Sequence, residues 1–215
     1  MMDWNKLLTT KRWREIDLKT APSTRFEGDL RSEFERDYGR AVFSAPFRRL
    51  QDKTQVFPMD PNDSVRTRLT HSIEVSSVAR GIALGAGRGM EENGFVTREQ
   101  ASAIETIAAT CGLVHDFGNP PFGHSGEKAI GEWFERQDGC FFADFSGRKG
   151  EDTIPGRKTR FASDFLRFEG NAQTIRLLAR LQVLADFHGL NPTAATLSAA
   201  CKYMAPSDMV AEEPH

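Results

Sequence analysis

The stretch C-G-L-V-H-D-F-G-N-P-P-F-G-H-S-G-E, residues 111–127, holds two histidines, an aspartate and a glutamate within a short span. An apolar, helix-like run leads up to His115-Asp116, and Pro120-Pro121 prevents the helix from continuing because proline lacks the N–H and clashes with the preceding turn. The pair is therefore predicted at a helix end that faces a rigid loop. Imidazole nitrogen and carboxylate oxygen together suit a borderline divalent metal such as manganese, iron or zinc. We interpret His115 and Asp116 as two metal ligands.

A third ligand is needed, and His71 is the best candidate. Two helical faces are predicted from the i, i+4, i+7 spacing of apolar residues, and each face includes a histidine. The residues of the first face are His71, Val75, Val78 and Ile82, and those of the second are Ile104, Ala108, Cys111 and His115. Both histidines are thus predicted to point inward, where they can meet inside a helical bundle. We expect the first helix to end among the glycines at 81–89.

Three further segments accompany this stretch: F-R-R-L-Q-D-K-T-Q-V-F-P at 47–58, R-T-R-L-T-H-S-I-E-V at 66–75 and R-F-E-G-N-A-Q-T-I-R at 167–176. Together the four segments resemble the HD-domain phosphohydrolases, and specifically the deoxyguanosine triphosphate triphosphohydrolase family. The resemblance implies an all-α fold, an HD-domain helical bundle. It also implies metal-dependent hydrolysis of deoxynucleoside triphosphates to deoxynucleoside and tripolyphosphate, and relatives that assemble as homo-oligomers.

The resemblance also implies a substrate site. In this family the matching glutamine contacts the sugar, and Gln51 is the position that we carry over. Arg68 is three residues before His71, so on a helix it shares that face and can reach a phosphate, for which guanidinium is well suited. The alternative for Arg68 is a surface ion pair.

A second pair of polar side chains follows the proline turn. His124 and Glu127 are three residues apart near the start of a predicted helix, so both project to the same side. We interpret them as a catalytic proton-transfer couple; the alternative is a structural contact. Glu169 and Asn171 are expected inside a long apolar helix at 163–187, where burial requires hydrogen bonds. Asn171 is therefore a candidate to support the substrate or the metal pocket.

A divalent metal ion is the implied cofactor, manganese in preference to magnesium, iron or nickel. HD-domain sites take a further aspartate from a later helix. Asp186 and Asp208 are the only late aspartates in this chain, and neither stands in the family's matching motif. The chain is thus expected to be the N-terminal part of a longer enzyme. Asn119 stands where many relatives carry histidine.

Composition and charge limit the functions that the chain can have. The net charge of −2 argues against a globally basic nucleic-acid binder but leaves room for a local basic patch. The segment 138–160 is rich in glycine and carries a basic tail that can meet nucleotide phosphates, nucleic acid or only solvent. No run approaches the roughly 20 apolar residues that span a bilayer, and we expect a cytoplasmic protein. Three widely spaced cysteines suggest neither a disulfide framework nor a thiolate zinc site.

The predicted organisation is an N-terminal arm, residues 1–28, followed by an HD domain, residues 29–215, with a mostly irregular insertion at 138–160. A helix is expected soon after Asp29, because Ser32 and Glu35 have the spacing of a capping box. Two other functions stay open beside the triphosphohydrolase. One is a non-catalytic module that binds nucleotides or nucleic acid, and the other is an HD phosphohydrolase for another phosphoester.

Overall fold

The computed structural model describes residues 2–20, 28–55, 57, 62, 64–137, 160–181, 188–203 and 205–207. Within these residues the regular structure is helical, with two isolated β-bridges, Arg12–Thr193 and Thr54–Thr67. The all-α prediction is confirmed. The predicted insertion lies outside the described residues except for Arg160, and so do Asp186 and Asp208. The helices are α1 (Trp4–Leu7), α2 (Trp13–Leu18), α3 (Glu33–Val42), α4 (Ala45–Arg49), η1 (Leu50–Asp52), α5 (Arg68–Glu92), α6 (Arg98–Val114), α7 (His124–Glu135), α9 (Arg160–Leu166), α10 (Gly170–Ala179) and α11 (Ala194–Ala200).

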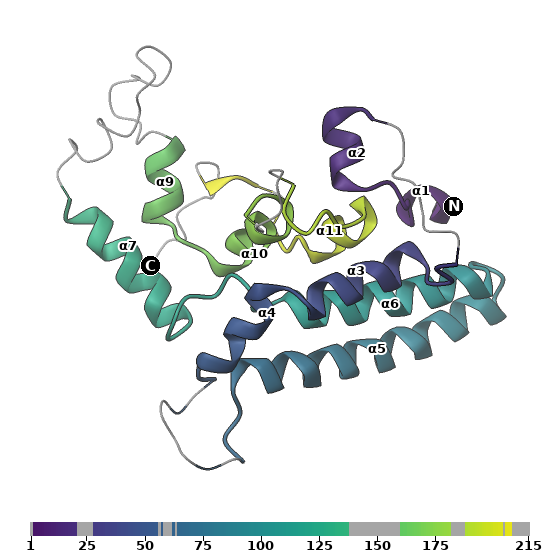
Figure 1. Ribbon diagram of the computed structural model, residues 1–215, viewed down its shortest axis with the longest axis horizontal. Helices are drawn as coiled ribbons and strands as arrows, with labels where there is room; N and C mark the ends of the chain where they lie inside the picture. Colours follow the sequence, from purple (N-terminus) through teal and green to yellow (C-terminus); the bar gives the residue numbers. More distant parts are fainter. Residues whose placement is uncertain are drawn as a thin grey trace.

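The long helices α5 and α6 run side by side in opposite directions, and α3 lies along α6 (Figure 1). Small residues let α5 and α6 approach closely. Ser76 Oγ donates a hydrogen bond of 2.7 Å to the carbonyl oxygen of Ala109. A Cβ added at Gly112 would lie 2.8 Å from Cα of Ser76, closer than real contacts allow. This contact sits within two turns of both His71 and His115, and therefore sets the spacing between their helices.

The buried face of α5 differs from the predicted one. Val78 and Ile82 are 62% and 69% exposed, so the apolar stripe that begins at His71 does not face the interior. The buried residues of α5 are Arg68, Ser72, Ser76, Ala83 and Gly87. Small and polar side chains line the interface because bulky ones would hold α5 away from α6. The predicted end of this helix among the glycines is also wrong, since α5 continues to Glu92.

The hydrophobic core joins the residues on either side of the His-Asp pair to four other helices. Leu113, Val114 and Phe117 are 1%, 1% and 3% exposed. They pack with buried apolar residues of α3, α4, η1 and α10, which are Ala41, Phe47, Leu50 and Leu178. The capping box at the start of α3 is confirmed, with Ser32 and Glu35 each bonded to the other's backbone N–H. The core thus fixes the C-terminal end of α6, where His115 and Asp116 follow.

The N-terminal residues are anchored by one buried arginine. Arg12 is 1% exposed and donates to Asp37 at 2.9 Å and to the carbonyl oxygen of Asn191 at 2.8 Å, and it also forms an ion pair with Glu33. The second oxygen of Asp37 accepts from both N–H and Oγ1 of Thr193. These charge-assisted bonds connect the start of α2 to α3 and to the cap of α11.

The helix expected at 163–187 is interrupted. Within the described residues α9 ends at Leu166 and α10 begins at Gly170. Glu169 is the N-cap of α10, with extended backbone angles, and its side chain accepts a hydrogen bond from the N–H of Ala172 at 2.8 Å. Glu169 is therefore not a polar group inside a helix. A side chain in the cap position competes with helix continuation, which apolar periodicity does not reveal.

Candidate metal centre

His71, His115 and Asp116 form the one group in the described part of the chain that could hold a metal ion. One ligand atom from each residue lies within 4.8 Å of the other two. The two imidazole ring centres are 5.3 Å apart, in an edge-to-face arrangement. His71 lies in the first turn of α5, and His115 and Asp116 follow the last residue of α6. The predicted convergence of the two imidazoles is confirmed, although the apolar stripe from which it was argued is wrong.

His115 is oriented by its own helix. Nδ1 lies 2.7 Å from the carbonyl oxygen of Gly112, which can only accept a hydrogen bond. In the neutral form of the ring, Nδ1 then carries the proton and Nε2 keeps its lone pair. Nε2 lies 3.4 Å from Oδ1 of Asp116. A histidine that donates from one nitrogen to a backbone carbonyl and offers the other is the common arrangement at metal sites.

Asp116 is buried, and both of its oxygens accept hydrogen bonds. Oδ2 accepts from Arg68 at 2.7 Å, and Oδ1 accepts from Nδ2 of Asn119 at 2.5 Å. A carboxylate has about four lone-pair directions, so each oxygen can also face a cation. The Arg68 side chain is 8% exposed, which rules out the surface ion pair that was the alternative for this residue. The contact of Arg68 with a phosphate stays a prediction.

The donor set fits a divalent ion. Bonds to zinc, a representative ion, are about 2.0–2.2 Å for nitrogen and oxygen ligands, so ligands of one ion are at most about 4.4 Å apart. The three ligand atoms, within 4.8 Å of one another, need only a small inward shift. Two neutral imidazoles and one carboxylate are typical ligands of borderline metals. The Arg68 guanidinium weakens this attraction by neutralising part of the charge on Asp116.

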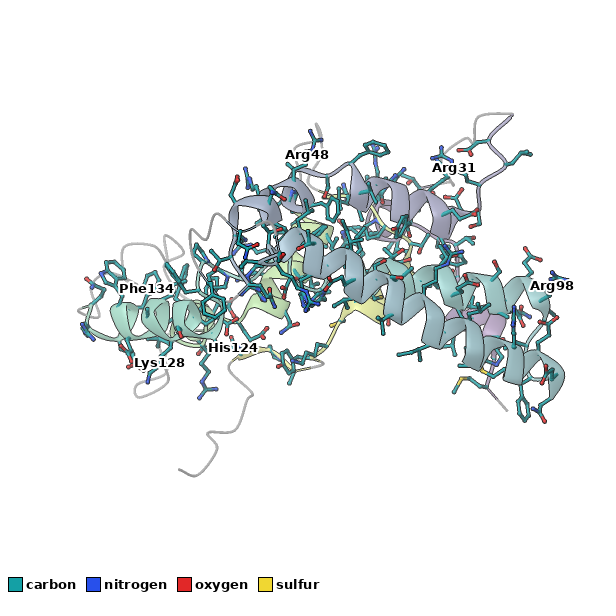
Figure 2. All side chains as sticks on the ribbon, turned by 90° about the horizontal axis from the view of Figure 1, so that it is seen from below. Arg31, Arg48, Arg98, His124, Lys128 and Phe134 are labelled. Carbon is teal, nitrogen blue, oxygen red and sulfur yellow. The ribbon has the colours of Figure 1, made fainter. Side chains whose placement is uncertain are left out.

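His124 and Glu127 form the predicted pair. His124 Nδ1 lies 2.7 Å from Oε2 of Glu127, and Oε1 of Glu127 accepts from the N–H of Gly170 at 2.8 Å. The Glu127 side chain is 12% exposed, whereas that of His124 is 93% exposed. Figure 2 shows His124 at the end of α7 nearer to α5 and α6, with Phe134 toward the other end. Glu127 is thus held by α10 and in turn holds an imidazole whose Nε2 faces outward.

The other predicted substrate residues are more dispersed. Gln51 is exposed in η1, and Asn171 is half-buried in the first turn of α10, where it donates to Oε1 of Glu169 at 2.5 Å. Asn171 therefore supports the cap of α10. Gln55 was not among the predicted site residues, yet its Oε1 is buried and accepts no hydrogen bond within the described structure. Its neighbour Thr54 forms a bridge with Thr67, directly before α5. The place of Gln55 in the donor-rich run at 47–58 was the available signal.

Lys53 is one of the basic residues near Gln51, which the family resemblance implies help to hold the nucleotide or line its pocket. Its Nζ donates to the carbonyl oxygen of Asn119 at 2.8 Å. Burial lowers the pKa of Lys53, and the positive charges of Arg68 and Arg49 lower it further, while Asp116 opposes them. The neighbouring Gly118 donates its N–H to Thr174 Oγ1 at 2.9 Å, and a Cβ there would lie 2.1 Å from the carbonyl oxygen of Gly170. The loop after the His-Asp pair is therefore fixed from both sides.

Comparison with known proteins defines the class. Residues 68–159 match the family model of the HD domain. The helical fold agrees with this match, and the chain carries an HD domain. HD domains bind divalent metals. None of the helices in the described part of the chain combines the length and hydrophobicity needed to cross a bilayer.

Relatives narrow the class further. A deoxyguanosinetriphosphate triphosphohydrolase-like protein of Listeria monocytogenes is 46% identical over 206 residues, 94% of this chain and 42% of the relative. A protein of the same name from Synechocystis is 42% identical over 212 residues, with the same coverage. A deoxyguanosinetriphosphate triphosphohydrolase of Klebsiella pneumoniae is 37% identical over 229 residues, 98% of this chain and 43% of the relative. The chain is homologous to these proteins, spans less than half of their length, and corresponds to their N-terminal part.

Proposed function

We propose that this chain takes part in metal-dependent hydrolysis of deoxynucleoside triphosphates to deoxynucleoside and tripolyphosphate. The observation that carries the proposal is the cluster of His71, His115 and Asp116 at the meeting of α5 and α6, in which the aspartate is buried and the two histidines are half-buried. The names of the relatives support a phosphohydrolase and point to a deoxynucleotide substrate. Because the chain spans less than half of these relatives, the activity of a whole protein is part of the proposal.

The cluster would hold the cofactor, for which we favour manganese over magnesium, iron or nickel. When bound, a divalent ion neutralises charge on phosphate oxygens and lowers the pKa of coordinated water. The chain itself contributes the orientation of the ligands. Gly112 fixes the His115 ring, and Arg68 and Asn119 fix the Asp116 carboxylate. A preorganised ligand set loses less entropy when the ion binds.

His124 is proposed to transfer the proton. Glu127, held by Gly170, accepts the hydrogen bond from His124 Nδ1, which leaves Nε2 available to exchange a proton with water or with the leaving oxygen. His124 is exposed, so a bound substrate would be needed to shield it from solvent. Arg68, beside Asp116, is proposed to contact a phosphate, since its Nε has no hydrogen-bond partner in the described structure.

Sugar recognition is proposed for the donor run at 47–58. Gln51 and Asn171 stay predictions, and Gln55 joins them because of its unpaired buried oxygen. A buried amide oxygen without a donor is unfavourable by about 1–3 kcal/mol, and a ligand hydroxyl group would remove that penalty. Homo-oligomers and contacts with nucleic acid also stay predictions.

The test begins with the metal content of the purified chain. The next step is an assay supplemented with Mn²⁺ across the four deoxynucleoside triphosphates, which measures tripolyphosphate and deoxynucleoside together. We expect equal amounts of the two products. His115→Ala and Asp116→Asn should lose bound metal while keeping the helical circular dichroism of the wild type. Asp3→Asn, which changes an exposed aspartate at α1, is the matched control. Wild-type metal content in Asp116→Asn would contradict the assignment.

A further inference from the structure

The turn that leads into α7 contains a strained aromatic residue. The N–H of Gly123 donates to the carbonyl oxygen of Pro120 at 3.1 Å, which closes a four-residue turn with Pro121 and Phe122 at its centre. Phe122 has a φ of +66°. Proline holds φ near about −65°, so a positive φ at the following position makes this a type II turn, in which glycine or asparagine is the usual residue. Phenylalanine is unfavourable there, because its Cβ crowds the backbone.

Packing within the described residues does not account for this strain. Phe122 is 71% exposed, so its ring adds little to the hydrophobic core. The turn itself is held from two sides, which lets an unfavourable φ persist. A Cβ at Gly126 would lie 2.1 Å from the carbonyl oxygen of Pro121, and the carbonyl oxygen of Asn119, directly before the turn, accepts from Lys53. The fold therefore keeps Phe122 in a conformation that lowers stability and leaves its ring in solvent.

The turn lies against the metal cluster. A Cβ at Gly123 would lie 2.9 Å from Nη2 of Arg68, and Nη1 of the same guanidinium donates to Asp116. After Gly123 the chain continues directly into His124, the first residue of α7. Phe122 thus stands on a short segment between the guanidinium proposed to contact a phosphate and the imidazole proposed to transfer a proton. Backbone strain that a fold maintains beside such groups indicates a function for the side chain.

We propose that the Phe122 ring stacks on the nucleobase of the deoxynucleoside triphosphate. A nucleobase is a flat aromatic ring, and such rings stack favourably on exposed phenylalanine. The contact forms only in the complex, so the strain of the free protein is offset when the ligand binds. Every base has a π face, and the ring therefore adds affinity without selecting a base. The identity of the ligand rests on the proposed function, whereas the strain at Phe122 does not.

The contact is tested on the whole chain with the two products of the proposed reaction, 2′-deoxyguanosine and inorganic tripolyphosphate, which both lack the bond to be cleaved. Equilibrium dialysis measures the affinity of each for the wild type, Phe122→Gly, Phe122→Leu and Phe122→Tyr. Phe95→Gly is the matched control, because Phe95 is 60% exposed, has an ordinary φ and lies between α5 and α6 at the end away from the metal cluster. Urea denaturation measures the stability of each variant.

We expect Phe122→Gly to bind 2′-deoxyguanosine about tenfold more weakly than the wild type does, and tripolyphosphate equally well. Its midpoint of urea denaturation should rise by about 0.3 M or more, because glycine adopts this φ without strain. Phe122→Tyr should keep the wild-type affinity for 2′-deoxyguanosine, and Phe122→Leu should lose most of it, because stacking needs an aromatic ring. Phe95→Gly should change neither affinity and should not raise the midpoint.

An affinity for 2′-deoxyguanosine that is absent in the wild type, or unchanged in Phe122→Gly, would overturn the contact. An equal loss for tripolyphosphate would overturn it too, since the variant would then distort the whole site. Wild-type affinity in Phe122→Leu would replace stacking by a general apolar contact. A lower urea midpoint in Phe122→Gly would assign the ring to the packing of the fold and overturn the proposal. The proposed function fails by a different measurement, namely if the wild type with Mn²⁺ releases no tripolyphosphate from deoxynucleoside triphosphates.

Discussion

At the scale of single residues, the chemistry of the site depends on what each polar group is bonded to. Asp116 is held by Arg68 and Asn119, and His115 is held by Gly112, so their orientation is determined before any ion arrives. His124 differs, because only Glu127 orients it and its ring stands in solvent. Metal binding and proton transfer are thus assigned to separate groups of residues, which makes the two roles separable by mutation.

The first prediction separates metal binding from proton transfer by a mutation of His124. His124→Gln should lower turnover by about 10²–10⁴-fold, the usual contribution of a general acid or base, and leave bound metal unchanged. Turnover is read from tripolyphosphate release, and metal from elemental analysis of the same preparation. Ser125→Ala, at the next exposed position of α7, is the control and should keep wild-type values. Equal losses of metal and turnover in His124→Gln would assign it a structural role.

The second prediction compares two glutamines of the donor run. Gln55→Ala should raise KM for a deoxynucleoside triphosphate by about tenfold, because a substrate hydroxyl group would lose its acceptor. Gln51→Ala, at an exposed position, should change KM less. The most direct comparison of the two variants uses 2′,3′-dideoxynucleotides, because these lack the sugar hydroxyl group that the glutamine would bind. If Gln51→Ala gives the larger effect, the original assignment of the sugar contact to Gln51 stands.

At the scale of elements, the α5–α6 pair carries the site because its interface is made of small residues. The exposed Val78 and Ile82 show that apolar periodicity alone did not reveal which face is buried. A helix surface of serine, alanine and glycine can be buried as completely as a surface of leucine when the backbone of the partner helix comes close. That close approach places the first turn of α5 against the last turn of α6.

The third prediction concerns the close packing of α5 against α6. Gly112→Ala should lower the free energy of unfolding by about 1–3 kcal/mol, because the added Cβ would overlap the backbone at Ser76. Gly81→Ala, in the interior of α5 with open space around it, should instead raise stability by about 0.5–1 kcal/mol. Urea denaturation followed by circular dichroism measures both. A neutral Gly112→Ala would mean that the two helices can move apart freely.

At the scale of the whole molecule, the N-terminal residues and α11 are joined to α3 around Arg12. Figure 1 shows α1 and α2 near α11, above the layer of α3 and α6. A buried guanidinium with two carboxylates and a backbone carbonyl makes residues far apart in sequence depend on one another. The predicted boundary after residue 28 stays a prediction, but the residues before it that are described contribute to the packing of those after it.

The fourth prediction is the pH dependence of that network. Burial raises the pKa of Glu33, but the hydrogen bonds and charges of Arg12 and Arg36 outweigh burial and lower it below its ordinary 4.5. A carboxyl whose pKa is lower in the folded state stabilises the fold above its unfolded pKa, and this stabilisation is lost as the pH falls through the folded value. The free energy of unfolding should therefore fall less on acidification below about pH 5 in Glu33→Gln than in the wild type. Glu91→Gln, at an exposed position of α5, should follow the wild-type curve.

The sequence by itself determined the helical class, the capping box at Ser32 and Glu35, and the residue types that are candidate metal ligands. These features depend on local chemistry, since caps, breakers and ligand types act over a few residues. It did not determine the length of α5, the break before α10 or the buried face of α5. Only the tertiary structure decided these, together with the pairing of Arg68 with Asp116 and the contact of Lys53 with Asn119. The reason is that close packing and buried ion pairs depend on which backbones come into contact, and that contact belongs to the whole fold.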